Sequence, residues 1–168
     1  MVAGVGTVRY VRAGQAIAFH VAGRGVMQHG LPLRRAAENL LESGVRQVSV
    51  HLRECAYMDS TFLGTLLKIG KKLEEKGGSP IALVDPSPAC AKIIREMGLG
   101  EFIVPADKVP EVVGPWVALT IDNSDTNSFR RNITEAHDEL ATLPGQAGEQ
   151  FRGVMRCLRP GEKKPTDQ

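Results

Sequence analysis

Residues 57–64 carry more information about the fold than any other part of the chain, and they read Tyr57-Met58-Asp59-Ser60-Thr61-Phe62-Leu63-Gly64. They follow the apolar segment 48–52 and open an amphipathic run that extends to about Lys76. Helical periodicity after an apolar segment and a polar cluster predicts a strand-to-helix junction. Hydroxyl groups at such a junction lie where backbone N–H groups and the positive end of a helix dipole favour a phosphate. An acid and two hydroxyls without a nearby base indicate a regulatory switch more than a catalytic centre.

The gross composition fits one domain with an appendage. The chain has 168 residues, of which 42% are hydrophobic and 24% charged, with a net charge of +2. This small charge argues against a nucleic-acid binder that works by bulk electrostatics. No secretory signal is visible, and no apolar run approaches the roughly 20 residues that span a bilayer. We expect a cytoplasmic protein with neither a nucleic-acid nor a membrane partner.

The three cysteines are widely spaced and form no Cys-x-x-Cys pair; they are Cys55, Cys90 and Cys157. Such a set gives no disulfide framework and fits a reducing compartment. Cys55 lies just before the junction, where a buried apolar thiol is expected, with a redox role as the alternative.

The first third of the chain predicts a β-hairpin and then a helix. Residues 7–11 and 15–21 alternate as two short strands around a turn at 12–14. Residues 23–30 are glycine-rich and predict a loop from strand to helix, since they lack the Gly-x-Gly-x-x-Gly spacing of a dinucleotide site. Pro32 fits the first turn of the following helix, which Gly44 ends.

Alternating strands and helices continue to about residue 104. Strands are expected at 47–52, 81–84 and 102–104, with a helix from Thr61 that ends at residues 77–78. Ser87 before Pro88 predicts the start of a short helix that Gly98 closes. This order predicts an α/β fold with parallel crossovers, and the opening hairpin makes the sheet mixed.

The last third predicts a helical extension. Residues 105–115 contain three prolines and indicate a boundary, and the apolar residues 116–121 form an extra strand or a packed extended segment. Two apolar stripes separated by residues 144–145 predict a helical hairpin, with N-cap candidates at 122–125. The expected organisation is a domain over 1–110, a helical extension over 115–160 and a disordered tail over 161–168.

The residues offer little support for an enzyme. Four scattered histidines share no metal-ligand spacing with a cysteine or carboxylate, and neither a nucleophile elbow nor a phosphate-binding loop is present. Asp59 and Ser60 could be read as base and nucleophile, but adjacent residues at a junction rarely face one another. We therefore expect no enzymatic activity, no metal and no cofactor. From the residues alone, Ser60 is first of all a candidate helix N-cap.

In this order of elements, residues 7–105 resemble a STAS domain, the fold of anti-sigma factor antagonists and of the tails of sulfate transporters. The resemblance rests on the opening hairpin, on residues 21–24 before the first helix, on the strand 48–52 and on residues 57–64. Residues 76–78 before the next strand and residues 97–99 complete it. The Asp-Ser-Thr/Ser-x-Leu-Gly element is fairly specific in this context.

The resemblance implies a bacterial transcription regulator that works by partner switching. In such antagonists an anti-sigma factor that is also a serine kinase phosphorylates the serine after the aspartate, which is Ser60 here, with Thr61 as the alternative. The unphosphorylated form binds the anti-sigma factor and frees the sigma factor, and a PP2C-type phosphatase resets the switch. The partner-binding residues implied are Asp59, Ser60, Thr61, Phe62 and Gly25.

One residue departs from the family pattern, because the family often has glycine where this chain has Phe62. The aromatic ring would either form part of the docking surface or pack inward.

Two alternative functions remain open. One is a scaffold or oligomerisation role, in which the STAS domain assembles with copies of itself or with a larger signalling complex, and the extension could make a homodimer or bind a further partner. The other is binding of a small molecule, a nucleotide or a lipid, by residues 23–30 and the helix terminus at Ser60. The extension itself could also cover the sheet or pack in another way on its own domain.

Overall fold

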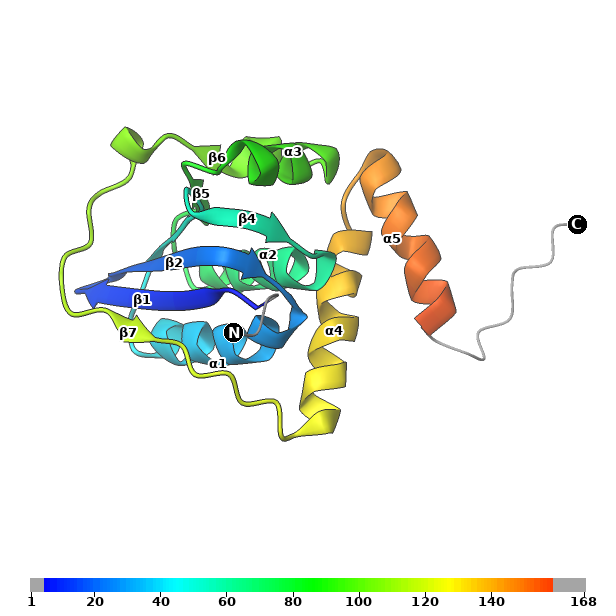
Figure 1. Cartoon of the computed structure of the whole chain (residues 1–168), viewed down its shortest axis with the longest axis horizontal. Coiled ribbons are helices and arrows are strands. Elements are labelled where there is room, and N and C mark those ends of the chain that lie inside the picture. Colours follow the sequence, from blue (N-terminus) through cyan, green and yellow to red (C-terminus); the bar gives the residue numbers. More distant parts are fainter. Residues whose placement is uncertain (1–4, 159–168) are drawn as a thin grey trace, which may run out of the picture.

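A computed structural model describes residues 5–158, which form a mixed seven-stranded sheet with helices (Figure 1). The strands are β1 (Thr7–Ala13), β2 (Ala16–Gly25), β3 (Gln47–His51), β4 (Cys55–Met58), β5 (Ala82–Val84), β6 (Ile103–Val104) and β7 (Val117–Ala118). Their order is β6-β5-β3-β2-β1-β7, with β4 pairing separately with β2. β1 pairs antiparallel with β2 and with β7, whereas the β2–β3, β3–β5, β5–β6 and β2–β4 pairs are parallel. The predicted mixed α/β class and opening hairpin are confirmed.

The helices are α1 (Met27–Glu42), α2 (Ser60–Glu75), α3 (Pro88–Glu96), α4 (Thr126–Ala141) and α5 (Gly145–Leu158). Short 3-10 turns, η1 (Gly100–Phe102) and η2 (Ala106–Lys108), lie near the last parallel strand. In Figure 1, α1 and α2 lie side by side on one face of the sheet. Their apolar stripes and the inward side chains of β1, β2, β3 and β5 form one core that is mainly aliphatic, as the low aromatic content predicts.

Many of the local signals in the sequence are confirmed. Gly44 follows the end of α1 with a φ of 103°, a left-handed conformation that favours glycine. Ser87 caps α3, because its Oγ accepts a hydrogen bond from Cys90 N at 3.2 Å. α4 and α5 form the predicted helical hairpin, and residues 117–118 form the predicted extra strand. Cys55 and Cys90 are free and fully buried.

The prediction of a loop over residues 23–30 is wrong. β2 continues to Gly25, and α1 begins at Met27. The strand continues because a second partner takes over where β3 ends: Arg24 and Gly25 pair with Tyr57 and Met58 of β4. No feature of the sequence had predicted β4.

The placement of Pro32 in the first turn is also wrong, because α1 begins five residues earlier and Pro32 lies inside it. Proline has no N–H, so the carbonyl of Gln28 lacks its usual partner within the helix. The side chain of Asn123 supplies the missing donor, with Nδ2 at 3.0 Å from Gln28 O. This bond fastens the segment before α4 to α1.

The helices of the extension lie on the helical layer, whereas its short strand β7 pairs with β1 at the edge of the sheet. α4 crosses α1 and α2 near their N-terminal ends, and α5 packs on the outer side of α4 (Figure 1). The predicted division into domains stays a prediction, and the predicted tail over 161–168 lies outside the described residues. Between residues 5 and 158, no helix is long and apolar enough to cross a membrane.

Candidate functional site

Asp59 is the residue that caps α2. Its Oδ1 accepts a hydrogen bond from Phe62 N at 2.8 Å, so Ser60 is the first helical residue and not the N-cap that the sequence suggested. A carboxylate satisfies a backbone donor of the first turn and favours the positive end of the helix dipole. The Ser60 hydroxyl is thereby released from capping.

The same carboxylate also binds the start of α1. Its Oδ2 accepts a hydrogen bond from Met27 N at 2.7 Å, and Asp59 N donates to Gly25 O at 3.0 Å. The N-cap of α1 is Val26, which has no polar side chain, so Asp59 replaces the missing cap. Asp59 therefore holds two helix N-termini together and is engaged as an acceptor on both oxygens.

Ser60 faces a histidine of the extension. Its Oγ lies 3.1 Å from Nε2 of His137 in α4, at hydrogen-bond distance, and the serine is partly buried. Thr61 Oγ1 lies 3.4 Å from the same nitrogen, and Thr61 is only 4% exposed. Both candidate acceptors are thus brought to one imidazole, and Ser60 is the more accessible of the two.

His137 is itself shielded. Its ring stacks on Phe151 of α5 with centroids 6.3 Å apart, and Nδ1 is buried without a hydrogen-bond partner among the described residues. Burial lowers the pKa of His137, and the charges of Asp59 and Asp138 only partly oppose this effect. Burial therefore favours the neutral form of the imidazole that faces Ser60.

Phe62 packs inward, which settles the two alternatives that the sequence left open. Its side chain is 0% exposed and makes an edge contact with His29, with ring centroids 6.0 Å apart. A Cβ atom on Gly25 would lie 2.9 Å from the Phe62 ring. Gly25 and Phe62 are thus a matched pair beneath the site, and their predicted contact with a partner can only be indirect.

The Ser60–His137 pair resembles the first two members of a nucleophile–base arrangement, but the rest of such a site does not follow. In serine hydrolases a third group accepts a hydrogen bond from the second ring nitrogen and orients the base. Among the side chains that the structure describes, Nδ1 has no such partner, and both oxygens of Asp59 bind backbone amides. This geometry suits a hydroxyl that is held and covered rather than activated.

Residues 57–64 lie within the part of the chain that matches a known protein family. A family model described as "Mlab, STAS domain" matches residues 8–105, more than half of the chain. The chain belongs to the STAS domain family. The matched STAS region ends before β7, so His137 comes from a part of the chain that the family model does not include.

Solved structures share the STAS fold at low sequence identity. The anti-sigma factor antagonist SpoIIAA in its unphosphorylated form is 20% identical, with a TM-score of 0.55 over 60% of this chain and 87% of that one. The Bacillus cell fate determinant SpoIIAA in its phosphorylated form is also 20% identical, with a TM-score of 0.51 over 60% and 90% of the two chains. The protein TM1081 is 18% identical, with a TM-score of 0.52 over 57% and 77%. Comparison with curated protein sequences gives no match.

The contribution of His137 was missed by sequence reasoning. The apolar stripe of the predicted helix contained Ile133, Ala136 and Leu140, and at helical spacing His137 lies at the edge of that stripe. This position indicated partial burial. Nothing in the sequence indicated that the stripe packs on the start of α2.

Proposed function

We propose that this protein is a non-enzymatic regulator of the anti-sigma factor antagonist type, which binds a partner protein under the control of phosphorylation at Ser60. The observation that carries the proposal is the position of the Ser60 hydroxyl. It belongs to the first residue of α2, is not used for capping, and lies on the fold of an antagonist known in unphosphorylated and phosphorylated forms. The family resemblance adds an anti-sigma factor kinase as the partner.

Electrostatics supports a switch at this residue. A phosphate adds about −1.5 to −2 charges at neutral pH, and the start of α2 favours negative charge. Asp59 already places one carboxylate there. A partner surface shaped for a neutral hydroxyl would face a much more negative site, and like-charge contact in a dry interface costs several kcal/mol.

A rim of exposed apolar and cationic side chains beside Asp59 offers further contacts for a partner. Met27 is 40% exposed and Tyr57 39% exposed, and the guanidinium of Arg24 lies 4.5 Å from the centre of the Tyr57 ring. Together with Val5 and Asp59 they line a hollow at the ends of β2 and β4. Exposed aromatic and methionine side chains of this kind are enriched in protein interfaces.

Binding of a candidate partner, an anti-sigma factor kinase of the histidine-kinase-like ATPase type, tests the proposal. Ser60→Ala should retain binding in calorimetric titration, and Ser60→Asp should lose it. Ser79→Asp adds the same charge at an exposed residue beyond the C-terminal end of α2, opposite to Ser60, and should bind like the wild type. If Ser60→Ala and Ser60→Asp bind equally well, the proposal fails.

Incubation with the kinase and ATP, followed by peptide mass spectrometry, identifies the acceptor. We expect the added phosphate on Ser60 and not on the more deeply buried Thr61. Resetting by a PP2C-type phosphatase, a homodimer and a cytoplasmic location stay predictions.

A further inference from the structure

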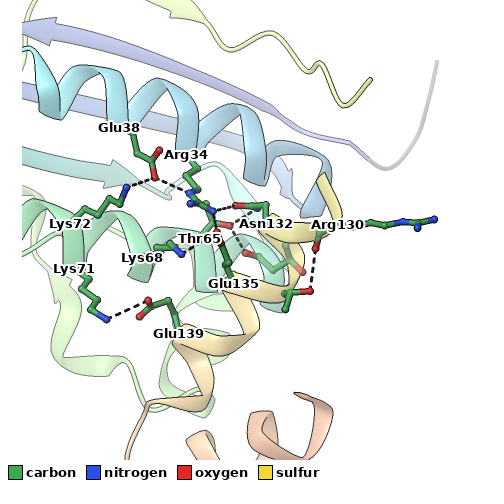
Figure 2. A network of polar contacts seen from close by, with 12 residues as sticks. Arg34, Glu38, Thr65, Lys68, Lys71, Lys72, Arg130, Asn132, Glu135 and Glu139 are labelled. Carbon is green, nitrogen blue, oxygen red and sulfur yellow. Dashed lines mark hydrogen bonds and ion pairs between the residues drawn. The ribbon is translucent and has the colours of Figure 1, made fainter. Parts of the chain in front are cut away.

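The surface of α1 and α2 that α4 covers, called here the α1–α2 groove, carries more basic than acidic side chains. One carboxylate lies among the cations, because Glu38 of α1 pairs with Arg34 at 2.8 Å and with Lys72 at 2.9 Å (Figure 2). Arg34 of α1 and Lys68 of α2 both form ion pairs with Glu135 of α4, and the Lys68 pair measures 3.1 Å (Figure 2). Further along the groove, Lys71 pairs with Glu139 of α4 at 3.7 Å. The Arg34, Lys68 and Glu135 side chains are 17%, 18% and 27% exposed, so these charges are largely shielded from solvent. Burial alone would raise the pKa of Glu135, but Arg34 and Lys68 outweigh it and lower the pKa.

The shape of the groove demands a small residue at the crossing point. A Cβ atom on Gly64 of α2 would lie 2.2 Å from the carbonyl oxygen of Ala136 and 3.0 Å from its Cα. The two helix backbones therefore touch here, which is possible because one residue has no side chain and the other has a single methyl group.

A buried amide fixes the register of α4 in the groove. Asn132 is 2% exposed, and its Nδ2 donates to Thr65 Oγ1 at 3.3 Å. Its Oδ1 accepts from Arg34 Nη1 at 3.4 Å, and Nδ2 would lie 2.6 Å from a Cβ on Gly30. A polar group that is buried and bonded on both sides tolerates few alternative alignments of the helix.

From these contacts we infer that the groove between α1 and α2 is a helix-binding site that α4 occupies within the same chain. We also infer that the partner which reads Ser60 inserts an acidic helix of the same pattern and must displace α4. The pattern is an amide, a carboxylate, a small residue and a carboxylate at positions i, i+3, i+4 and i+7, as in Asn132, Glu135, Ala136 and Glu139. The part of the inference that concerns the partner rests on the proposed function.

The position of Ser60 links the docking of α4 in the groove to phosphorylation. While α4 is docked, His137 lies 3.1 Å from Oγ and α4 covers the adjacent Thr61. The docked helix therefore restricts the approach of a kinase to this partly buried hydroxyl. α4 therefore controls both partner binding and the availability of Ser60.

The test uses the full chain with Glu135→Lys, which places a third cation beside Arg34 and Lys68 and leaves the groove itself unchanged. The probe is a fluorescent synthetic peptide with the sequence of residues 122–143. In the wild type, docked α4 competes with the peptide for the groove and lowers its apparent affinity. Because Glu135→Lys weakens this docking, we expect the peptide to bind the variant at least about tenfold more tightly than the wild type. Hydrogen exchange of α4 should increase in the same variant. Glu149→Lys makes the same substitution at an exposed residue of the extension and should behave as the wild type.

A charge swap completes the design. Adding Lys68→Glu to Glu135→Lys restores an opposite pair and should return both peptide binding and α4 exchange toward wild-type values. Should Glu135→Lys also expose the sheet to exchange, Glu139→Lys, which reverses the charge opposite Lys71, replaces it.

Equal peptide binding to wild type and to the charge-reversed variant overturns the inference, as does release of α4 without peptide binding. None of these measurements uses a kinase. If the groove behaves as described but Ser60→Asp leaves partner binding intact, the proposed function fails and the helix-binding site stands.

Discussion

Gly64→Ala tests the closest contact between α4 and the STAS domain. The added Cβ would lie 2.2 Å from the carbonyl oxygen of Ala136 and 2.7 Å from its carbonyl carbon. Both are backbone atoms of a helix and cannot turn aside as a flexible side chain would. Restoring the 3.4 Å of an ordinary contact requires α4 to retreat by about 1.2 Å along this line.

Two opposing terms set the size of the effect. Alanine in place of glycine stabilises a helix interior by about 0.5–1 kcal/mol, whereas overpacking of a close contact costs about 1–3 kcal/mol. We expect a net loss of about 1–2 kcal/mol in the free energy of unfolding. At about 2–4 °C per kcal/mol for a chain of this size, the melting temperature should fall by about 2–8 °C. The loss should be accompanied by faster hydrogen exchange in α4.

Two other glycine substitutions serve as controls. Gly100→Ala meets no atom closer than 3.7 Å and should change the stability by less than about 0.5 kcal/mol. Gly30→Ala meets the amide end of Asn132, which can rotate away at the cost of one hydrogen bond, about 1 kcal/mol. A Gly64→Ala protein as stable as the wild type, with unchanged exchange in α4, would refute the close packing of α4 on α2.

Three further predictions concern the surroundings of the site. Burial lowers the pKa of His137 below its usual 6.5, so the folded protein binds fewer protons than the unfolded chain. The free energy of unfolding should therefore fall as the pH drops below 6.5. Urea denaturation should show a weaker pH dependence of this free energy in His137→Asn. Asn123→Ala removes the donor to Gln28 O and should cost about 1 kcal/mol in the same assay. Gly25→Ala should lower the free energy of unfolding by about 1–3 kcal/mol, because the added methyl group overpacks against Phe62. The loss should be smaller when Phe62→Leu is already present. Equal losses in both backgrounds would contradict the contact.

The parts of the fold that the sequence predicts well are those with local signals. The cap at Ser87, the helix end at Gly44 and the break at residues 144–145 each depend on neighbouring residues alone, and the structure has all three. The segment 23–30 was misread for the opposite reason. Its glycines are typical of a loop, but here Gly25 belongs to a strand because it pairs with β4. The residue is glycine because the Phe62 ring leaves no room for a side chain.

The candidate site shows the same division. Its place at the start of α2 follows from residues 57–64, but which member of the Asp59–Ser60 pair caps the helix was open, since both residue types are good caps. The second acceptor role of Asp59 and the contact of Ser60 with His137 join residues 32 and 77 positions apart. Such contacts depend on how α1 and α4 pack on α2, and a single sequence contains no periodicity or motif that encodes this.

Glu135→Lys and Gly64→Ala separate the effects of charge and of shape when α4 and a partner helix compete for the α1–α2 groove. Glu135→Lys weakens the docking of α4 and leaves the groove as it is, whereas Gly64→Ala places its methyl group inside the groove. A partner helix therefore gains access in the first variant and meets the same obstruction as α4 in the second. Docking worth about 2 kcal/mol would weaken the apparent affinity of the partner about thirtyfold, because only undocked molecules can bind it. A partner that releases α4 must then supply this free energy through its own carboxylates opposite Arg34 and Lys68, and it must present a small residue to Gly64.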